Sequence, residues 1–304
     1  MTPFPDELRI LPVLSGTIMR GTAMSDKQLG HNSGIAERAH RVRRNAIRMA
    51  QVQGQGYVAQ ALGVADVLSV AYFHAMRHRP DQPDWEGRDR FLLSVGHYAI
   101  AHYAVLTEAG FLPEDELDTY GCDDSRLPMS GMTSYTPGME MSGGSIGLGL
   151  PMAVGLGLGF KLKRTDQKVF VLMGDGELAE GPTWEAATSA AHYRLGNIVA
   201  IVDFNKIQAD GPSMSVMCTE PVVAKFEAFG WHVQRVDGND LSALIAAFDT
   251  ACTLAEDKPR MIVCDTRLGR GVDFLEGREK SHFIRLEAED WTRAFAALEA
   301  GRQA

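Results

Sequence analysis

The sequence has few cysteines, no long hydrophobic run and no excess of positive charge. Its four cysteines form no CxxC pair, which argues against a paired-cysteine framework and is typical of reduced thiols in a cytoplasmic protein. The longest apolar stretch, residues 146–160, is rich in glycine and shorter than the ~20 residues that span a bilayer. The net charge of −9 argues against nucleic acid and anionic membranes as partners.

The composition is that of an ordinary globular protein. The chain has 304 residues, of which 45% are hydrophobic and 23% charged, so it could hold one large domain or two ordinary ones. Residues 1–33 are rich in Gly, Ser, Thr and Pro and lack sustained periodicity, and we expect them to be a flexible extension. We expect residues 34–304 to form one domain.

Apolar runs and segments of helical periodicity alternate along that domain. The predicted strands are residues 91–94, 168–173, 198–202, 232–236 and 261–265. The predicted helices are residues 35–53, 63–77, 98–110, 150–163, 180–195, 221–229, 241–255 and 286–300. This alternation predicts an α/β fold with a doubly wound, mostly parallel sheet and helices on both faces. A loop as long as 121–145 is usually functional.

The most informative motif is Gly174-Asp175-Gly176 with the more distant Asn205. The glycines and the aspartate directly follow the predicted strand 168–173, and Asn205 follows the next predicted strand, 198–202. The carboxyl ends of two parallel strands joined by a helix lie at the same edge of the sheet. We therefore expect Asp175 and Asn205 to meet at that edge, where open α/β sheets bind their ligands.

Asp175 and Asn205 offer hard oxygen ligands. One carboxylate and one amide are too few for an all-protein calcium cage, but they suit Mg²⁺, which shares its six ligands with water and phosphate oxygens. The neighbouring glycines let the backbone approach a phosphate and donate N–H groups to it. The motif predicts a Mg²⁺–diphosphate site, and the alternative is an ordinary strand–helix–strand unit with a turn aspartate and a loop asparagine.

This segment resembles the thiamine diphosphate motif, and in detail it looks like the amino-terminal half of the transketolase family. Further matching stretches occur in the family's order from about residue 35 to the end of the chain. The stretches that carry the resemblance are residues 83–85, 88–91, 94–97, 142–149, 174–181, 192–207, 210–211, 228–231 and 237–240. Several independent motifs make the resemblance far more specific than one signature.

The resemblance implies thiamine diphosphate and Mg²⁺ as cofactors. It makes Asp175 and Asn205 side-chain ligands of Mg²⁺, adds the backbone carbonyl of Ile207 as a third ligand, and lets the Gly176 N–H bind the diphosphate. Ile146 would be an apolar platform for the aminopyrimidine ring. The residues implied to bind the cofactor are His97, Gly144, Ser145, Ile146, Gly174, Asp175, Gly176, Glu177, Asn205 and His282.

The catalytic residues that the resemblance implies are His97, His282 and Glu180. His97 would contact cofactor phosphate near the substrate, and the alternative is a turn histidine satisfied by its neighbours. His282 would lie beside the cofactor, although Phe283 stands where the family usually has glycine. Glu180 would join two active sites through a carboxylate network at a dimer interface.

Two departures from the family affect the predicted substrate site. Residues 54–57 read Gly-Gln-Gly-Tyr where the family usually has Gly-His-Pro-Gly, and Ser130 stands where a second substrate-facing histidine is usual. Gln55 and Ser130 can hydrogen-bond a sugar hydroxyl, but neither can carry a proton near neutral pH. We expect Gln55, Ser130 and His97 to bind the substrate, which need not be a usual pentose phosphate.

Full-length transketolases also carry a pyrimidine domain, and the chain shows no counterpart of it. The resemblance implies the amino-terminal subunit of a split transketolase, completed by a carboxy-terminal subunit in a heterotetramer. The expected reaction transfers a two-carbon ketol unit from a ketose to an aldose, and the substrates are sugars or sugar phosphates. The cofactor would supply the electron sink, and the protein would supply metal, orientation and exclusion of water.

Two other interpretations remain at this point. The α subunit of a 2-oxo acid dehydrogenase also combines the Gly-Asp-Gly motif and a distant asparagine with a separate partner, but the stretches 88–91, 94–97 and 195–207 look like transketolase. A catalytically silent regulatory subunit would keep the fold without the chemistry. The intact Asp175, Gly176 and Asn205 argue against that interpretation.

Overall fold

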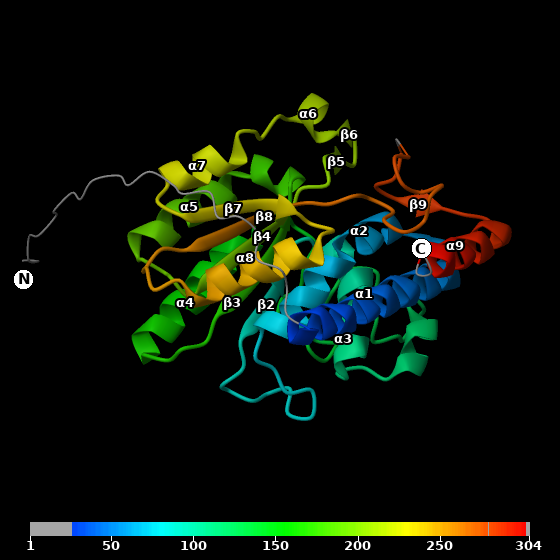
Figure 1. Ribbon diagram of the computed structural model, residues 1–304, viewed down its shortest axis with the longest axis horizontal. Coiled ribbons are helices and arrows are strands. Elements are labelled where there is room, and N and C mark those ends of the chain that lie inside the picture. Colours follow the sequence, from blue (N-terminus) through cyan, green and yellow to red (C-terminus); the bar gives the residue numbers. More distant parts are fainter. Residues whose placement is uncertain (1–25, 279, 302–304) are drawn as a thin grey trace, which may run out of the picture.

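The computed structural model describes residues 26–278 and 280–301. They form a central five-stranded sheet with helices packed around it (Figure 1). The strand order is β2–β3–β4–β8–β7, and all neighbouring strands are parallel. The strands are β2 (Arg90–Leu93), β3 (Val169–Gly174), β4 (Ile198–Asp203), β7 (His232–Asp237) and β8 (Arg260–Asp265). The predicted α/β class with a parallel sheet is confirmed, and the strands lie close to their predicted positions.

Burial explains why these residues form strands. Every residue of β3 and β4 is buried, as expected for central strands of a parallel sheet that is covered on both faces. Alternate residues of β3 enter opposite cores: Phe170 and Leu172 pack on one side, and Val171 and Met173 on the other. The edge strand β7 is only partly buried.

Helices cover both faces of the sheet. The α-helices of the described residues are α1 (Asp26–Gln53), α2 (Val58–Val70), α3 (Ala99–Ala109), α4 (Gly149–Lys163), α5 (Gly181–His192), α6 (Ser213–Val216), α7 (Val222–Ala228), α8 (Leu241–Thr253) and α9 (Ala288–Gly301), and all but the short α6 contribute to one of the two cores. One core contains residues of α1, α2, α3, α8 and α9, and Figure 1 shows α1, α2 and α3 grouped together. The second core, on the opposite face, contains residues of α4, α5 and α7.

Several helix boundaries differ from the prediction. Helix α1 begins at Asp26 instead of residue 35, and residues 1–25 of the predicted extension lie outside the described residues. Helix α2 begins at Val58 instead of residue 63. Gly63 lies inside the helix, and it is a glycine because another part of the backbone approaches it closely. A Cβ at Gly63 would lie 2.8 Å from the carbonyl oxygen of Arg267.

The stretch Val58–Ala75 is apolar and long enough to cross a membrane by length and composition alone. However, 83% of it is buried inside the protein, where α2 contributes side chains to the core beside α1 and α3. Its last residues, Ala71–Ala75, form a π-helical turn. Its apolar character is therefore that of a central core helix.

Two short antiparallel ladders were not predicted. Strand β1 (Gln55–Gly56) pairs with β9 (Ile284–Arg285), and β5 (Ile207–Gln208) pairs with β6 (Gly211–Pro212). Each ladder contains only two residue pairs, which is too short for a periodic signal in the sequence. Both ladders carry predicted site residues, so they fix the segments on which the candidate site depends.

Candidate functional site

The candidate site lies at the carboxyl edge of the parallel sheet. Asp175 follows β3 directly, Asn205 lies just beyond β4, and Thr266 follows β8. The turn Gly96–Tyr98 follows β2 at the same edge. The N–H of Asp175 donates to the carbonyl oxygen of Asp203 at 3.1 Å, so the parallel pairing of β3 and β4 continues into the site, as the sequence predicted.

Asp175 is a buried carboxylate that several donors hold in place. Its Oδ1 accepts the Gly176 N–H at 2.8 Å. Its Oδ2 accepts the Lys206 N–H at 2.9 Å and the Ser213 hydroxyl at 2.7 Å. Burial, together with the nearby charge of Asp203, raises the pKa of Asp175 to about 6. A bound cation would favour the charged form of such a carboxylate.

Asn205 is oriented by a buried polar cluster. Its Nδ2 donates to Oδ2 of Asp203 at 2.6 Å and to the Tyr98 hydroxyl oxygen at 2.8 Å. Its Oδ1 accepts the N–H of Ile207 at 3.0 Å. Tyr98 and Thr266 also donate their hydroxyl groups to Asp203, whose pKa is raised by burial. The amide oxygen of Asn205 therefore faces the turn at residues 205–207.

The turn at residues 205–207 connects the two predicted side-chain ligands. Its central residue, Lys206, has φ +70°, a left-handed conformation that is uncommon outside glycine. The Lys206 N–H binds Asp175, and the next N–H binds Asn205. Ile207 pairs with Pro212, which has no N–H to donate to the Ile207 carbonyl oxygen.

This donor set fits Mg²⁺ better than a metal that needs a complete protein cage. Asp175, Asn205 and Ile207 offer a carboxylate, an amide oxygen and a carbonyl oxygen beside one turn, and Mg²⁺ takes its remaining ligands from water and phosphate. Within residues 26–278 and 280–301, no group of three or more His, Cys, Asp or Glu side chains is arranged to hold a metal ion. The Gly176 N–H, which we predicted to bind diphosphate, binds Asp175 in this structure.

Close backbone packing brings the loop 121–145 against the β2 turn. A Cβ at Gly96 would lie 2.3 Å from the carbonyl carbon of Gly143, so no other residue fits there without movement of the backbone. Gly131 donates its N–H to the Gly96 carbonyl at 3.3 Å, and the Ser130 hydroxyl donates to the Gly143 carbonyl at 3.1 Å. Ser130 and Gly144 are thus placed next to His97.

A cavity of about 520 Å³ collects residues from distant parts of the chain, and its lining residues are Gln55, Tyr57, His97, Met129, Ser130, Gly144, His282 and Phe283. The three predicted substrate-binding residues are all among them. The rings of His97 and His282 lie 5.2 Å apart between centroids. Burial, with a smaller effect of His282, lowers the pKa of His97 to about 3. Burial also lowers the pKa of His282, so both rings are neutral at pH 7.

A larger cavity of about 1050 Å³ adjoins the first one. It is lined by Asn205, Ile207 and the segment around His282, and it shares Tyr57, His282 and Phe283 with the smaller cavity. The smaller volume is typical of ligand sites, and the larger one is at the upper end of their usual range. The predicted metal turn and the predicted substrate residues therefore line two adjoining cavities that share Tyr57, His282 and Phe283.

Other predicted site residues, including Asp175 and Gly176, are not in the lining of either cavity. Gly174 ends β3, and Ser145, Ile146, Glu177 and Glu180 line neither cavity. Glu177 is 1% exposed; its Oε1 accepts the Gly147 N–H at 2.7 Å and the Ser94 hydroxyl. Burial raises the pKa of Glu177. Glu177 thus supports the turn that ends the stretch Gly144–Ile146, and Glu180 is the residue before helix α5.

Sequence reasoning missed the polar groups that hold the predicted residues in place. Asp203, Tyr98 and Thr266 orient Asn205, and Ser213 binds Asp175. The signal for Asp203 was present, because a carboxylate ends the otherwise apolar run Ile198–Asp203 just before Asn205. Thr266 and Ser213 gave no such signal, since their positions depend on the return of distant segments to the same edge.

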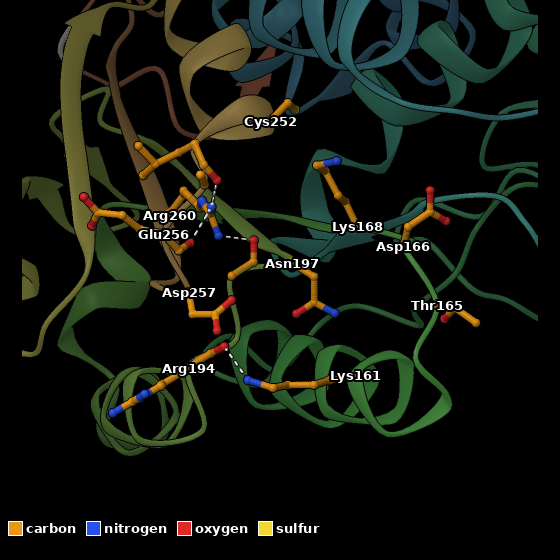
Figure 2. Close-up of a pocket in the computed structure, with 13 residues that line it drawn as sticks. Lys161, Thr165, Asp166, Lys168, Arg194, Asn197, Cys252, Glu256, Asp257 and Arg260 are labelled. Carbon is orange, nitrogen blue, oxygen red and sulfur yellow. Dashed lines mark hydrogen bonds between the residues drawn. The ribbon is translucent and has the colours of Figure 1, made fainter. Parts of the chain in front are cut away.

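A separate pocket of about 300 Å³ lies at the opposite, amino edge of the sheet (Figure 2). Lys168, Asn197 and Arg260 line it, and they stand at the starts of β3, β4 and β8. The buried guanidinium of Arg260 donates to four backbone carbonyls, those of Gly196, Leu254, Glu256 and Lys258. Arg260 thus ties loops together at the end of the sheet that is remote from Asp175.

Comparison with known proteins decides the family. The model of the transketolase thiamine diphosphate binding domain matches residues 36–299. The chain belongs to the transketolase family. It is 61% identical over 274 residues to a transketolase family protein of Sinorhizobium fredii, covering 90% of this chain and 98% of that protein. This assignment favours the transketolase interpretation over the 2-oxo acid dehydrogenase alternative.

Two further relatives of similar length are named as subunits. The chain is 36% identical to the 6-deoxy-6-sulfo-D-fructose transketolase subunit of a Clostridium species, covering 91% of this chain and 98% of that protein. It is 37% identical to one of the apulose-4-phosphate transketolase subunits of Actinobacillus succinogenes, covering 82% of this chain and 90% of that protein. The match to this chain thus spans nearly the whole length of both relatives.

Solved transketolases share the fold. The structure of the Campylobacter jejuni enzyme matches with a TM-score of 0.82 and 32% identity over 87% of this chain. The enzyme of Leishmania mexicana matches with a TM-score of 0.80 and 33% identity over 87% of this chain. The chain spans about two fifths of the length of these enzymes, since it covers 42% and 41% of them.

Proposed function

We propose that this chain is the amino-terminal subunit of a two-chain transketolase, which uses thiamine diphosphate and Mg²⁺ to transfer a two-carbon ketol unit from a ketose to an aldose. The observation that carries the proposal is the turn at residues 205–207. It binds Asp175 through one N–H and Asn205 through the next, at the carboxyl edge of a parallel sheet. The family's thiamine diphosphate binding domain covers this region.

In this proposal Asp175, Asn205 and the Ile207 carbonyl hold Mg²⁺, which in turn holds the diphosphate. The bound cofactor supplies the electron sink for cleavage of the carbon–carbon bond. His97 and His282 line the smaller cavity with neutral rings, so each can donate or accept a hydrogen bond at the substrate or the cofactor. Gln55 and Ser130 bind sugar hydroxyls from the same cavity.

The partner in this proposal is a carboxy-terminal subunit that carries the pyrimidine domain. Two observations support it. Relatives of nearly equal length are named as transketolase subunits, and helix α4 presents an uncovered apolar stripe. Leu148 just before the helix is 45% exposed, and Met152 and Leu162 are 43% and 75% exposed. Two copies of each subunit would give the heterotetramer.

The substrate in this proposal is a sugar or a sugar phosphate. The relatives named above act on 6-deoxy-6-sulfo-D-fructose and on apulose-4-phosphate, as their names state. In this chain, the described residues that line the smaller cavity include no Lys, Arg, Asp or Glu. We therefore assign hydroxyl and carbon groups of the sugar to the smaller cavity. Any phosphate or sulfonate binds outside it, where Arg267, Arg278 and Lys280 of the larger cavity or the partner subunit can supply positive charge.

The test uses the complex reconstituted from both subunits. Titration calorimetry should show thiamine diphosphate binding in the presence of Mg²⁺, and Asp175→Asn should weaken it at least tenfold. Glu185→Gln, on the exposed surface of α5, is the matched control and should bind normally. Ketose–aldose exchange should occur only with both subunits present. Oxidative decarboxylation of a 2-oxo acid without ketol transfer, or cofactor binding insensitive to Asp175→Asn, would contradict the proposal.

A further inference from the structure

Two aromatic residues extend the short β1–β9 ladder into the site. The ladder pairs Gln55 with Arg285 and Gly56 with Ile284. The next pair in the same register is Tyr57 with Phe283, and their ring centroids lie 5.1 Å apart at an interplanar angle of 78°. This edge-to-face arrangement is the favoured geometry for two aromatic rings. The ladder therefore fixes both rings against each other.

The aromatic pair stands in the wall between the two cavities. Tyr57 and Phe283 line both of them. The Tyr57 ring also lies 4.8 Å from the ring of His97 and 5.4 Å from that of His282. A buried glutamine, Gln60, fixes the backbone behind the pair, because its Nε2 donates to the His282 carbonyl at 2.7 Å.

Tyr57 packs partly against the main core, but neither ring belongs to a residue of the ladder. The two residue pairs of the ladder end at Gly56 and Ile284, and the resemblance described above has glycine at both residues 57 and 283. Each aromatic side chain therefore fills space that a glycine would leave open. The rest of the cavity wall is neutral: Gln55 and Ser130 offer hydrogen bonds, and Met129 adds apolar surface.

We propose that Tyr57 and Phe283 together determine substrate specificity by limiting the length of the sugar chain that the smaller cavity admits. The inference rests on the proposed function. The carbon chain beyond the bond that is made or broken occupies the same space in the ketose donor and in the aldose acceptor, so one wall limits both. The pair favours aldoses of two to four carbons over those of five or six.

The test compares acceptors with one fixed donor in the reconstituted complex. Hydroxypyruvate loses CO₂, and its remaining two carbons join the aldehyde carbon of the acceptor, so the donor adds no sugar chain of its own. The acceptors are glycolaldehyde, D-glyceraldehyde, D-erythrose and D-ribose. The variants are Tyr57→Ala, Phe283→Ala and the double variant. Tyr193→Ala, at an exposed tyrosine beyond α5, is the matched control.

We expect the double variant to raise the ratio of kcat/KM for ribose to kcat/KM for glyceraldehyde at least tenfold. A pocket wall discriminates by about 10- to 200-fold for each methylene group. Tyr57→Phe and Phe283→Leu keep the bulk and should keep the wild-type ratio, and so should the control. A loss of activity that is equal for all acceptors would show that the rings only position His97 and His282, and it would overturn the proposal.

The two proposals fail in different ways. A wild-type complex that transfers no ketol unit to any acceptor would contradict the proposed function. In that case, saturation-transfer NMR of ribose and glyceraldehyde with the same complex tests whether the aromatic pair limits the length of the bound sugar. A selective gain of ribose binding in the double variant supports the length limit, and an unchanged preference between the two aldoses overturns it.

Discussion

Asn205 donates a hydrogen bond of 2.6 Å from Nδ2 to Oδ2 of Asp203, and this contact determines which end of the amide faces the site. A carboxylate oxygen accepts the NH₂ group, so the amide oxygen of Asn205 points to the opposite side. There it accepts the N–H of Ile207, beside the turn that binds Asp175. A buried acid that touches no ligand thus orients a predicted metal ligand.

Replacing Asp203 by asparagine should separate this orienting role from stability. In Asp203→Asn the new amide can face Asn205 with either end, so the ligand orientation is no longer fixed. We expect the affinity of the complex for Mg²⁺ and thiamine diphosphate to fall 10- to 100-fold, as for other groups that orient metal ligands. Calorimetry measures this affinity, and Asp257→Asn at the remote amino edge is the control.

Asp203→Asn should also change the free energy of unfolding. Burial disfavours the charged form of Asp203, but an amide has one acceptor oxygen where Tyr98, Asn205 and Thr266 now donate to two. We therefore expect the free energy of unfolding to fall by about 1–3 kcal/mol. Urea unfolding measures that free energy. Unchanged cofactor affinity together with a large loss of stability would show that Asp203 serves only the fold.

A second prediction concerns Ser94, which connects two segments of the site. Its hydroxyl donates to Glu177 and accepts the Gly149 N–H at 2.9 Å. Ser94→Ala leaves a buried carboxylate and a buried N–H without this partner, and we expect the free energy of unfolding to fall by about 1–3 kcal/mol. Ser189→Ala, where the hydroxyl binds only a carbonyl of its own helix, is the control.

The double variant Ser94→Ala/Glu177→Gln tests the cause of that loss. If the unpaired charge of Glu177 is responsible, the neutral glutamine relieves part of the penalty, and the double variant is more stable than the sum of the two single effects predicts. Strict additivity in urea unfolding would show that the two side chains do not act as a unit.

The central fold was predictable because its strands are uniformly apolar. The runs Val169–Gly174 and Ile198–Asp203 are buried on both faces, so their hydrophobicity alone marked them and placed Asp175 and Asn205 at one edge. The start of α2 was mispredicted because Gly63 resembles a helix boundary in the sequence. A glycine is needed at position 63 because the backbone of Arg267 lies close to it, and no local sequence pattern reveals that contact.

The part of the site that could not be predicted depends on contacts between distant segments. The β1–β9 ladder joins segments at the two ends of the domain, and each strand has only two residues. Tyr57 and Phe283 therefore gave no sign in the sequence that they meet. Family resemblance identified both positions as unusual, but only the register of the ladder shows that the two replacements form one wall.

A third prediction is that buried histidine makes the protein less stable in mild acid. His102 is fully buried, its Nε2 lies 2.5 Å from the Tyr72 hydroxyl oxygen, and burial lowers its pKa from 6.5 to about 3. Between these values the unfolded chain binds a proton that the folded chain does not, so stability falls as the pH falls below 6.5. The loss from pH 7 to pH 5 should be about 2 kcal/mol from this group.

Urea unfolding of wild type and His102→Gln at both pH values measures this loss. The variant is expected to be less stable at pH 7, since it repacks a buried ring, but its change between pH 7 and pH 5 should be smaller by about 2 kcal/mol. His97, whose pKa is also lowered to about 3, keeps part of the dependence. Exposed His192, changed to Gln, is the control. Equal pH dependence in wild type and His102→Gln would contradict the prediction.

A fourth prediction concerns the apolar stripe of helix α4. Met152 is exposed in the isolated chain, so Met152→Glu should leave the free energy of unfolding within about 0.5 kcal/mol of wild type. In the complex the stripe is covered in our proposal, and a charge buried there without a partner is costly. We therefore expect association with the pyrimidine-domain subunit to weaken at least tenfold, as measured by analytical ultracentrifugation.

Lys163→Glu, which changes charge at the exposed end of the same helix, controls for general electrostatic effects on the stripe. It should change association less than Met152→Glu, because a charged side chain at that position already faces solvent. Equal weakening by both variants would indicate repulsion at long range, which high salt would screen. Association unaffected by Met152→Glu would place the partner on another face, because a buried carboxylate at the centre of the stripe could not be tolerated there.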